Sequence, residues 1–234
     1  MALLLENYYS HDFFKTIPEL GSAIDNFVER KIYLLIDQLG PIFHKHGVNR
    51  DYGLILCHRH FDIEHNEILV EVLKKDHRVS VATPWKLNGG KVIPSEDETL
   101  DVVREDADVP YVIPQTWGFD DNAELKAYEF LASRMELGTQ KPPPEFVAEL
   151  YEKLKQLGCE KIFGLRFIGN MIGRVSCEIT PKGKRASILS FDGKDMDKTK
   201  MFQVVFMFCK EDGMGLCEDC SSSCTGDTVC IKRY

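Results

Sequence analysis

The stretch Tyr52-Gly-Leu-Ile-Leu-Cys-His-Arg-His60 marks a change of hydrophobic period in the chain. Before it, residues 22–46 place apolar side chains at the spacing of one helix face, with Ser22 as candidate N-cap and Gly47 as the stop. Residues 52–60 and 67–73 are strand-like and are joined by a short polar link, which predicts a hairpin. The first half therefore reads as helix, glycine, hairpin.

The second half of the chain repeats this order. Residues 145–157 carry one apolar helix face, and Gly158 ends it. Further strand-like segments cover residues 79–82, 161–168, 174–180, 186–191 and 201–209. We therefore predict an α+β fold, an antiparallel sheet packed by two long helices, with an internal pseudo-repeat of helix-plus-hairpin units. The alternative is two unrelated helix-to-strand connections that both use glycine.

The spacing within the pseudo-repeat extends beyond the glycines. The hairpins close with Val70-Glu71-Val72 in the first half and Cys177-Glu178-Ile179 in the second. The matching positions after the two glycines are Tyr52 and Phe163, Gly53 and Gly164, Leu54 and Leu165, and Leu56 and Phe167.

The composition is that of a globular protein, with 44% hydrophobic and 28% charged residues among 234. The formal net charge of -8 disfavours a protein that coats DNA, because that function needs a surplus of Lys and Arg. No signal peptide is recognisable, and no apolar run reaches the roughly 18 residues of a membrane span. These features predict a cytoplasmic protein with no DNA or membrane partner, built from a single domain, residues 1–208, and a Cys-rich tail, residues 209–234.

The most specific local pattern is the acidic string Asp120-Asp121-Asn122-Ala123-Glu124. We expect it to open a helix over residues 121–136, where residues three and four apart share a face. Asp120, Asp121 and Glu124 would then present three carboxylates that can chelate a divalent cation, grip a guanidinium or supply a general base. The alternative is a simple helix cap, because carboxylates stabilise the positive end of a helix.

The Asp-Asp-x-x-Glu string resembles the signature of the fungal arginine-containing cyclodipeptide synthases, and only Asp120, Asp121 and Glu124 carry the match. The resemblance implies an enzyme of secondary metabolism, an aminoacyltransferase that condenses arginyl-tRNA and a second aminoacyl-tRNA into a cyclo-Arg-Xaa diketopiperazine. It implies that these three carboxylates are catalytic. Because aminoacyl esters are already activated, no cofactor is required for catalysis, and no nucleotide-binding glycine pattern is present.

Aromatic and basic residues supply candidates for substrate binding. Trp117 and Tyr128 lie close to the acidic string in sequence and could wall a pocket for the second aminoacyl group, although such residues more often belong to the core. Lys182, Lys184 and Arg185 could form a local basic patch for a tRNA acceptor stem. The alternative for this basic segment is a solvated hairpin turn.

The segment Cys57-His58-Arg59-His60 is a second chemical candidate. On a strand, His58 and His60 share a face. They could ligate zinc, with Glu64, His65 or Glu67 completing the site, or one of them could act as general base on the attacking amine. The alternative is a hydrogen-bonded pair of histidines at a strand end.

The tail is the third candidate, because Cys217, Cys220, Cys224 and Cys230 lie close together with one Cys-x-x-Cys spacing. Such a cluster predicts a structural zinc site in a reducing compartment. It supports a competing hypothesis, that the chain is a zinc-binding, non-enzymatic interaction protein. The remaining alternative is a tail of free thiols.

Overall fold

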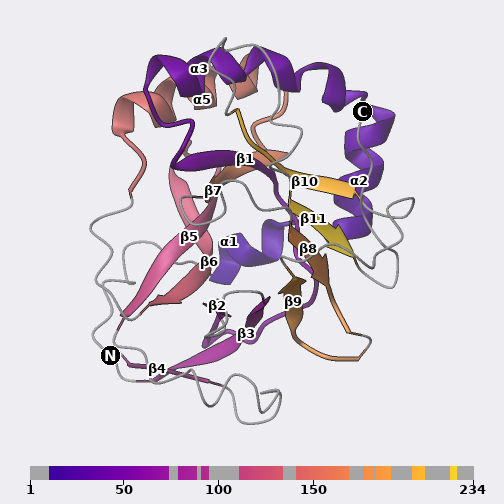
Figure 1. The fold of residues 1–234 in the computed structure, drawn as a ribbon, viewed down its shortest axis with the longest axis vertical. Helices are drawn as coiled ribbons and strands as arrows, with labels where there is room; N and C mark the ends of the chain where they lie inside the picture. Colours follow the sequence, from indigo (N-terminus) through magenta and orange to yellow (C-terminus); the bar gives the residue numbers. More distant parts are fainter. Residues whose placement is uncertain are drawn as a thin grey trace.

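A computed structural model of the chain describes residues 11–73, 79–88, 91–94, 111–133, 141–168, 176–181, 183–190, 202–208 and 222–225. Within these ranges a large curled sheet dominates, with short helices around it (Figure 1). The helical elements are α1 (His11–Thr16), α2 (Leu20–Glu29), the 3₁₀ turns η1 (Ile32–Leu34) and η2 (Ile36–Gln38), α3 (Gly40–Lys45) and α5 (Pro144–Gln156). The strands of the first half are β1 (Tyr52–Leu56), β2 (Glu67–Leu73), β3 (Val79–Asn88) and β4 (Lys91–Pro94). The later strands are β5 (Tyr111–Phe119), β6 (Leu125–Ser133), β7 (Phe163–Phe167), β8 (Ser176–Ile179), β9 (Ser187–Ser190), β10 (Phe202–Phe206) and β11 (Ser222–Thr225).

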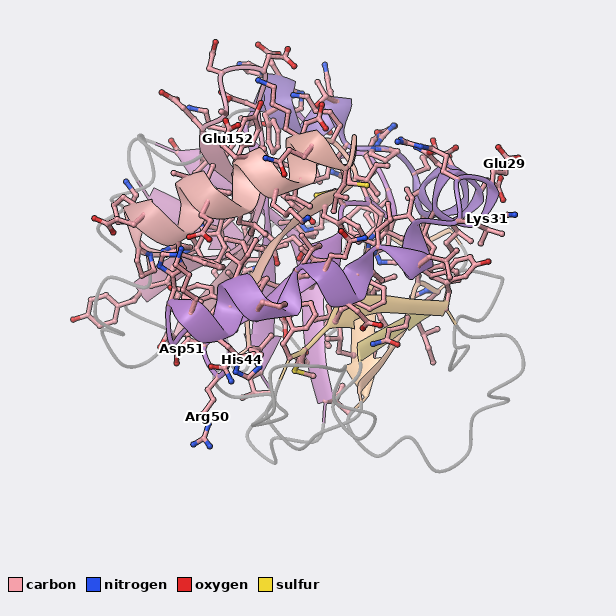
Figure 2. All side chains as sticks on the ribbon, turned by 90° about the horizontal axis from the view of Figure 1, so that it is seen from above. Glu29, Lys31, His44, Arg50, Asp51 and Glu152 are labelled. Carbon is pink, nitrogen blue, oxygen red and sulfur yellow. The ribbon has the colours of Figure 1, made fainter. Side chains whose placement is uncertain are left out.

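The sheet curls until its pairing returns to its starting strand. Its order is β2-β6-β5-β7-β1-β10-β11-β8-β9-β3-β4, and β3 also pairs with β2. The pairs β2–β6 and β8–β11 are parallel, whereas the other pairs are antiparallel. Helices α3 and α5 lie across one end of this curled sheet, beside β1 and β7 (Figures 1 and 2). On α5, Phe146, Leu150 and Leu154 are fully buried at helical spacing, which fixes the face that packs on the core.

The expectation of an antiparallel sheet packed by two long helices is wrong. The sheet is mixed and curled, and the expected helix over residues 22–46 is divided into α2, two 3₁₀ turns and α3. It breaks at Lys31, whose φ of 52° is left-handed, and Pro41 lies in the first turn of α3, where its ring is tolerated.

Two further local expectations are also wrong. Within the helix expected over residues 121–136, the described residues 121–133 are not helical: they form a turn and then β6, which pairs with both β5 and β2. Sheet pairing and burial there override intrinsic propensity. Likewise, β1 pairs with β7 and β10 instead of forming a hairpin with β2.

The two halves nevertheless make the same helix-to-strand connection. Gly47 and Gly158 end α3 and α5 with φ values of +66° and +65°, which glycine adopts without a steric penalty. After them, β1 and β7 pair antiparallel with Leu54 opposite Leu165. Further pairings correspond as well: β5–β7 matches β10–β1, β2–β6 matches β8–β11, and β2–β3 matches β8–β9, whereas β3–β4 has no counterpart among the described strands. The strand pairing therefore follows a pseudo-two-fold scheme.

Candidate functional site

Buried ionisable side chains from many strands meet inside the curled sheet. Arg166 on β7 donates to Glu71 Oε2 on β2 and to Glu129 Oε2 on β6, both at 2.6 Å, and to Thr116 Oγ1 at 2.8 Å. Beside them is a cavity of about 10 Å³. Its lining comes from β1, β6, β7, β8, β9 and β10 and from the segment after β1, and consists of Ile55, His58, Glu129, Arg166, Glu178, Leu189, Val204 and Val205. Burying charged groups is energetically costly, and clusters of buried ionisable residues are common at functional sites, so this interior is the first candidate site.

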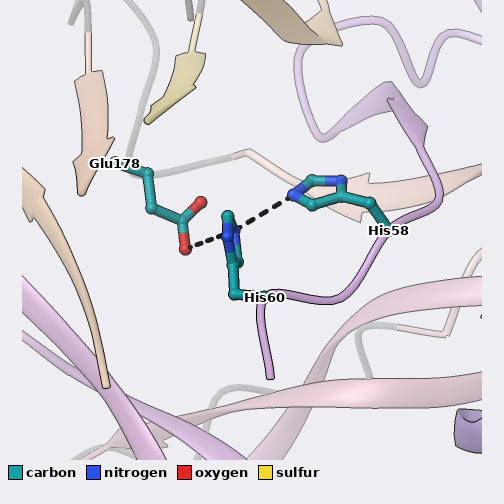
Figure 3. Close-up of side chains that lie close together, drawn as sticks. All are labelled: His58, His60 and Glu178. Carbon is teal, nitrogen blue, oxygen red and sulfur yellow. Dashed lines mark hydrogen bonds and ion pairs between the residues drawn. The ribbon is translucent and has the colours of Figure 1, made fainter. Parts of the chain in front are cut away.

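The segment after β1 holds two histidines in this interior. Its middle residue, Arg59, is anchored to the α1–α2 connection: its N–H donates to Pro18 O, its carbonyl accepts from Leu20 N–H, and its Nε donates to Ile17 O. Arg59 also forms ion pairs with Glu19 and Asp62. Because Arg59 is fixed outward, His58 and His60 on either side of it project inward, toward Glu178 of β8 (Figure 3).

Hydrogen bonding fixes the tautomer of His58. Its Nδ1 lies 2.7 Å from the carbonyl oxygen of Leu56, which can only accept, so Nδ1 carries the proton. In the neutral ring, Nε2 is then a lone pair, and it lies 3.2 Å from His60 Nε2. Burial, followed by the neighbouring His60, lowers the pKa of His58 to about 4, which keeps the ring neutral at neutral pH.

The third member of this group is a glutamate, and it comes from the other half of the chain. Glu178 Oε1 lies 3.1 Å from His60 Nε2. Burial lowers the pKa of His60, but the charge and hydrogen bond of Glu178 outweigh this and raise it above its usual value. The ligand-type atoms of His58, His60 and Glu178 all lie within 4.8 Å of one another. Of the partners expected from sequence, Glu67 instead pairs with Arg185, and His65 stacks edge-on against His11.

The Arg166 network has its own electrostatic balance. Burial raises the pKa of Glu129, while Arg166 and the hydroxyl of Thr116 act in the opposite direction. Burial alone would lower the pKa of Arg166, but the charges of Glu71, Glu129 and Glu178 raise it. The guanidinium therefore stays charged and holds two carboxylates in fixed positions.

The acidic string forms the turn between β5 and β6 instead of opening a helix. Asp120 Oδ1 accepts from the backbone N–H groups of Asn122 and Glu124, each at 2.9 Å, and Ala123 has a left-handed φ of 64°. Lys126 Nζ lies 2.7 Å from Glu124 Oε2, and Lys161 Nζ lies 2.7 Å from Asp121 Oδ1. The hydrogen bond and charge of Lys161 lower the pKa of Asp121. The string thus has a structural role as a turn, with its carboxylates partly neutralised by lysines.

A second and larger cavity, of about 420 Å³, lies beside this turn and α1. It is lined by Asp12, Phe13, Thr16, Ile17, Pro18, Cys57, Gly118, Phe119, Asp120, Asp121, Asn122, Lys126, Glu160 and Lys161. We call it the acidic cleft. It has no lining residue in common with the interior cavity: Cys57 lines the cleft, and the next residue, His58, lines the interior. The structure therefore does not bring Asp120, Asp121 and Glu124 together with His58 and His60.

Four other sequence candidates, Trp117, Tyr128, Lys184 and Arg185, line neither cavity. Trp117 and Tyr128 are 2% and 1% exposed and belong to the core. Arg185 bonds to Glu67 and to the carbonyl of Asp62, and Lys184 is exposed. Cys224 lies in β11, where it pairs with Glu178 in the sheet register. Lys182, Cys217, Cys220 and Cys230 lie outside the described residues.

Sequence reasoning did not assign the interior carboxylates and arginine to a site. Their common signal is a charged residue within a strand whose two chain neighbours are apolar, as Glu71 lies between Val70 and Val72 in β2. Such a residue must be paired if both faces of the strand are buried. The members that carry this signal are Glu71, Glu129, Arg166 and Glu178.

Comparisons with protein-family models, with curated proteins and with solved structures each find no match. Among the described residues, no helix has the length and apolar character needed to span a membrane.

Proposed function

We propose that the protein is an enzyme of aminoacyl transfer, an arginine-containing cyclodipeptide synthase that condenses arginyl-tRNA with a second aminoacyl-tRNA. The proposal rests on the resemblance of the acidic string and on one structural observation: Asp120 and Asp121 of that string line a cavity of about 420 Å³. Turn residues on a flat surface would have offered no room for a substrate.

The lining of the acidic cleft suits a guanidinium group. Asp12, Asp120, Asp121 and Glu160 supply carboxylates, which bind a guanidinium through paired charge-assisted hydrogen bonds. Phe13 and Phe119 add aromatic surface of the kind on which a guanidinium stacks. The lysine that pairs with Asp121 is half exposed, and exposed ion pairs are weak, so an arginyl group can replace it.

The cleft also contains a candidate base for the reaction. In the first step the α-amine of one aminoacyl group attacks the ester carbonyl of the other; an amide bond forms, the ester bond breaks, and a tRNA leaves with its hydroxyl restored. The same exchange within the dipeptidyl ester closes the ring. Each attacking amine loses a proton, and Glu160 is suited to accept it, because its Oε2 is buried without a hydrogen-bond partner among the described residues. Burial raises the pKa of Cys57 to about 12, so a thioester intermediate on that residue is disfavoured.

The test is a mass-spectrometric search for arginine-containing diketopiperazines in a microbial host that expresses the full chain. Asp121→Ala is the informative variant, because the side chain of Asp121 is exposed and does not hold the turn. Glu152→Ala, an exposed carboxylate on α5 outside the cleft, is the matched control (Figure 2). We expect a cyclo-Arg product from the wild type and the control, reduced at least about tenfold in Asp121→Ala. Absence of product from soluble wild-type protein would contradict the proposal.

A further inference from the structure

We propose that His58, His60 and Glu178 bind one divalent transition-metal ion, with zinc as the first candidate, in the interior of the curled sheet. This inference concerns the interior cavity, not the acidic cleft, and it does not depend on the reaction proposed above. Two imidazoles and one carboxylate form a ligand set used by catalytic zinc sites and by non-haem iron sites.

The distances between the ligand atoms suit a single ion. Zinc–ligand bonds of about 2.0–2.1 Å at a tetrahedral angle separate neighbouring ligand atoms by about 3.4 Å. The separation is 3.2 Å between His58 Nε2 and His60 Nε2, and 3.1 Å between His60 Nε2 and Glu178 Oε1. Figure 3 shows the three side chains converging from the segment after β1 and from β8. The third pair, His58 and Glu178, is within 4.8 Å, so these two side chains must approach each other when one cation binds all three atoms.

Proton counting favours a cation over a set of hydrogen bonds. His58 carries its proton on Nδ1, so its Nε2 offers a lone pair, and the carboxylate of Glu178 offers lone pairs only. His60 Nε2 approaches both of these acceptors, but it carries at most one proton and can donate to one of them. A metal ion at the centre accepts all three lone pairs. The Leu56 carbonyl on His58 Nδ1 is the kind of outer contact that orients metal-binding histidines.

The charge of the interior points the same way. Three carboxylates, those of Glu71, Glu129 and Glu178, meet one permanent cation, Arg166, whose two ion pairs are with Glu71 and Glu129. Buried charges are costly unless they are balanced. A divalent ion held by His58, His60 and Glu178 would add positive charge on the Glu178 side of this interior.

The neighbouring cavity leaves a place for a fourth ligand. Its volume of about 10 Å³ is close to the space that one water molecule requires, and both His58 and Glu178 line it. Three protein ligands and one exchangeable position are the arrangement of catalytic zinc, whereas structural zinc usually has four protein ligands. The ligand set therefore fits a reactive metal centre.

The experiment uses the full chain, freed of metal by a chelator and titrated with Co²⁺, followed by Zn²⁺ competition. Because Cys217 and Cys220 could bind the same ions, the titration is run on the wild type and on a Cys217→Ser, Cys220→Ser variant. We expect one equivalent of Co²⁺ to remain bound in that variant, with visible ligand-field bands and no thiolate-to-cobalt charge-transfer band. Loss of all stoichiometric binding in the serine variant would overturn the proposal, because the metal would belong to the tail.

Substitution of a ligand provides the second arm. Glu178→Gln keeps the size of the side chain and removes its charge, and we expect it to weaken Co²⁺ and Zn²⁺ binding at least about 100-fold, with His60→Ala giving a similar loss. The control is Glu149→Gln, which alters a comparable histidine–glutamate contact on the surface, 2.8 Å from His46 Nε2. If a ligand variant fails to fold, the spectrum of the serine variant still decides the question. Equal affinity in folded Glu178→Gln and wild-type protein would refute the site.

Discussion

Replacement of the buried arginine by an apolar residue of similar length, Arg166→Met, is predicted to be strongly destabilising. Arg166 is 6% exposed and donates to two buried glutamates at 2.6 Å. Removing one member of a buried ion network leaves the remaining charges uncompensated, a loss of about 3–5 kcal/mol in the free energy of unfolding. That loss is a large part of the stability of a typical domain. Arg50→Met is the matched control, because Arg50 projects into solvent (Figure 2) and its replacement should change the free energy by less than about 0.5 kcal/mol.

The loss should depend on pH in a defined direction. The pKa of Glu129 is already raised by burial, and Arg166 acts against that rise, so the variant raises the folded-state pKa further. A carboxyl group whose folded pKa exceeds its unfolded value binds more protons when folded, and its folded form loses stability as pH increases through that window. The difference between Arg166→Met and wild type should therefore be larger at pH 8 than at pH 5.

Urea unfolding at the two pH values, followed by circular dichroism, measures both effects. Adding Glu129→Gln to Arg166→Met should recover about 1–2 kcal/mol at pH 8, because one uncompensated charge disappears. A loss below about 1 kcal/mol, or a loss equal at both pH values, would show that the network is not the buried balance of charge described above.

Two further predictions concern packing and the buried thiol. A Cβ on Gly164 would lie 1.9 Å from Trp117 O, so Gly164→Ala should separate β5 from β7 and lower the melting temperature sharply. A Cβ on Gly21 in α2 would have nothing within 4 Å, so Gly21→Ala should stabilise the protein by about 0.5–1 kcal/mol. Thermal melts measure both effects, and equal effects would contradict the strand geometry. Burial raises the pKa of Cys57 to about 12, so its thiol should resist iodoacetamide at pH 8 in the native protein and react readily in urea. Peptide mass mapping measures the labelling, and fast labelling of the native protein would show that the thiol is not buried as described.

The local part of the fold could be predicted from sequence, and the long-range part could not. The glycines after α3 and α5 and the strands that follow them depend on short-range signals, and the structure contains them. The partners of β1 could not be predicted, because β7 and β10 are far away in the chain. The helix predicted over residues 121–136 was wrong for a related reason. Local propensity favours a helix there, but β6 pairs with a strand on each side.

The candidate site divides in the same way. The shared face of His58 and His60 follows from their spacing, and the structure places both in the interior. Their third partner could not be identified, because Glu178 reaches them only through the curl of the sheet. The acidic string was recognisable as a motif, but its turn geometry depends on the pairing of β5 with β6, which its own sequence does not encode.

The pseudo-two-fold pairing relates the proposed metal site to the Arg166 network. One path of paired strands runs from β1 through β10 and β11 to β8, and the equivalent path runs from β7 through β5 and β6 to β2. In the registers of these two paths, Glu178 and Glu71 occupy equivalent positions. The equivalent pairs met on the way are Ile55 and Arg166, Val205 and Thr116, Ser222 and Glu129, and Ser176 and Leu69. Arg166 neutralises Glu71 with a built-in guanidinium, but its counterpart Ile55 has no charge to offer Glu178. The two histidines meet Glu178 instead, and because neutral imidazoles bind metal ions, this half of the interior can hold a cation that dissociates.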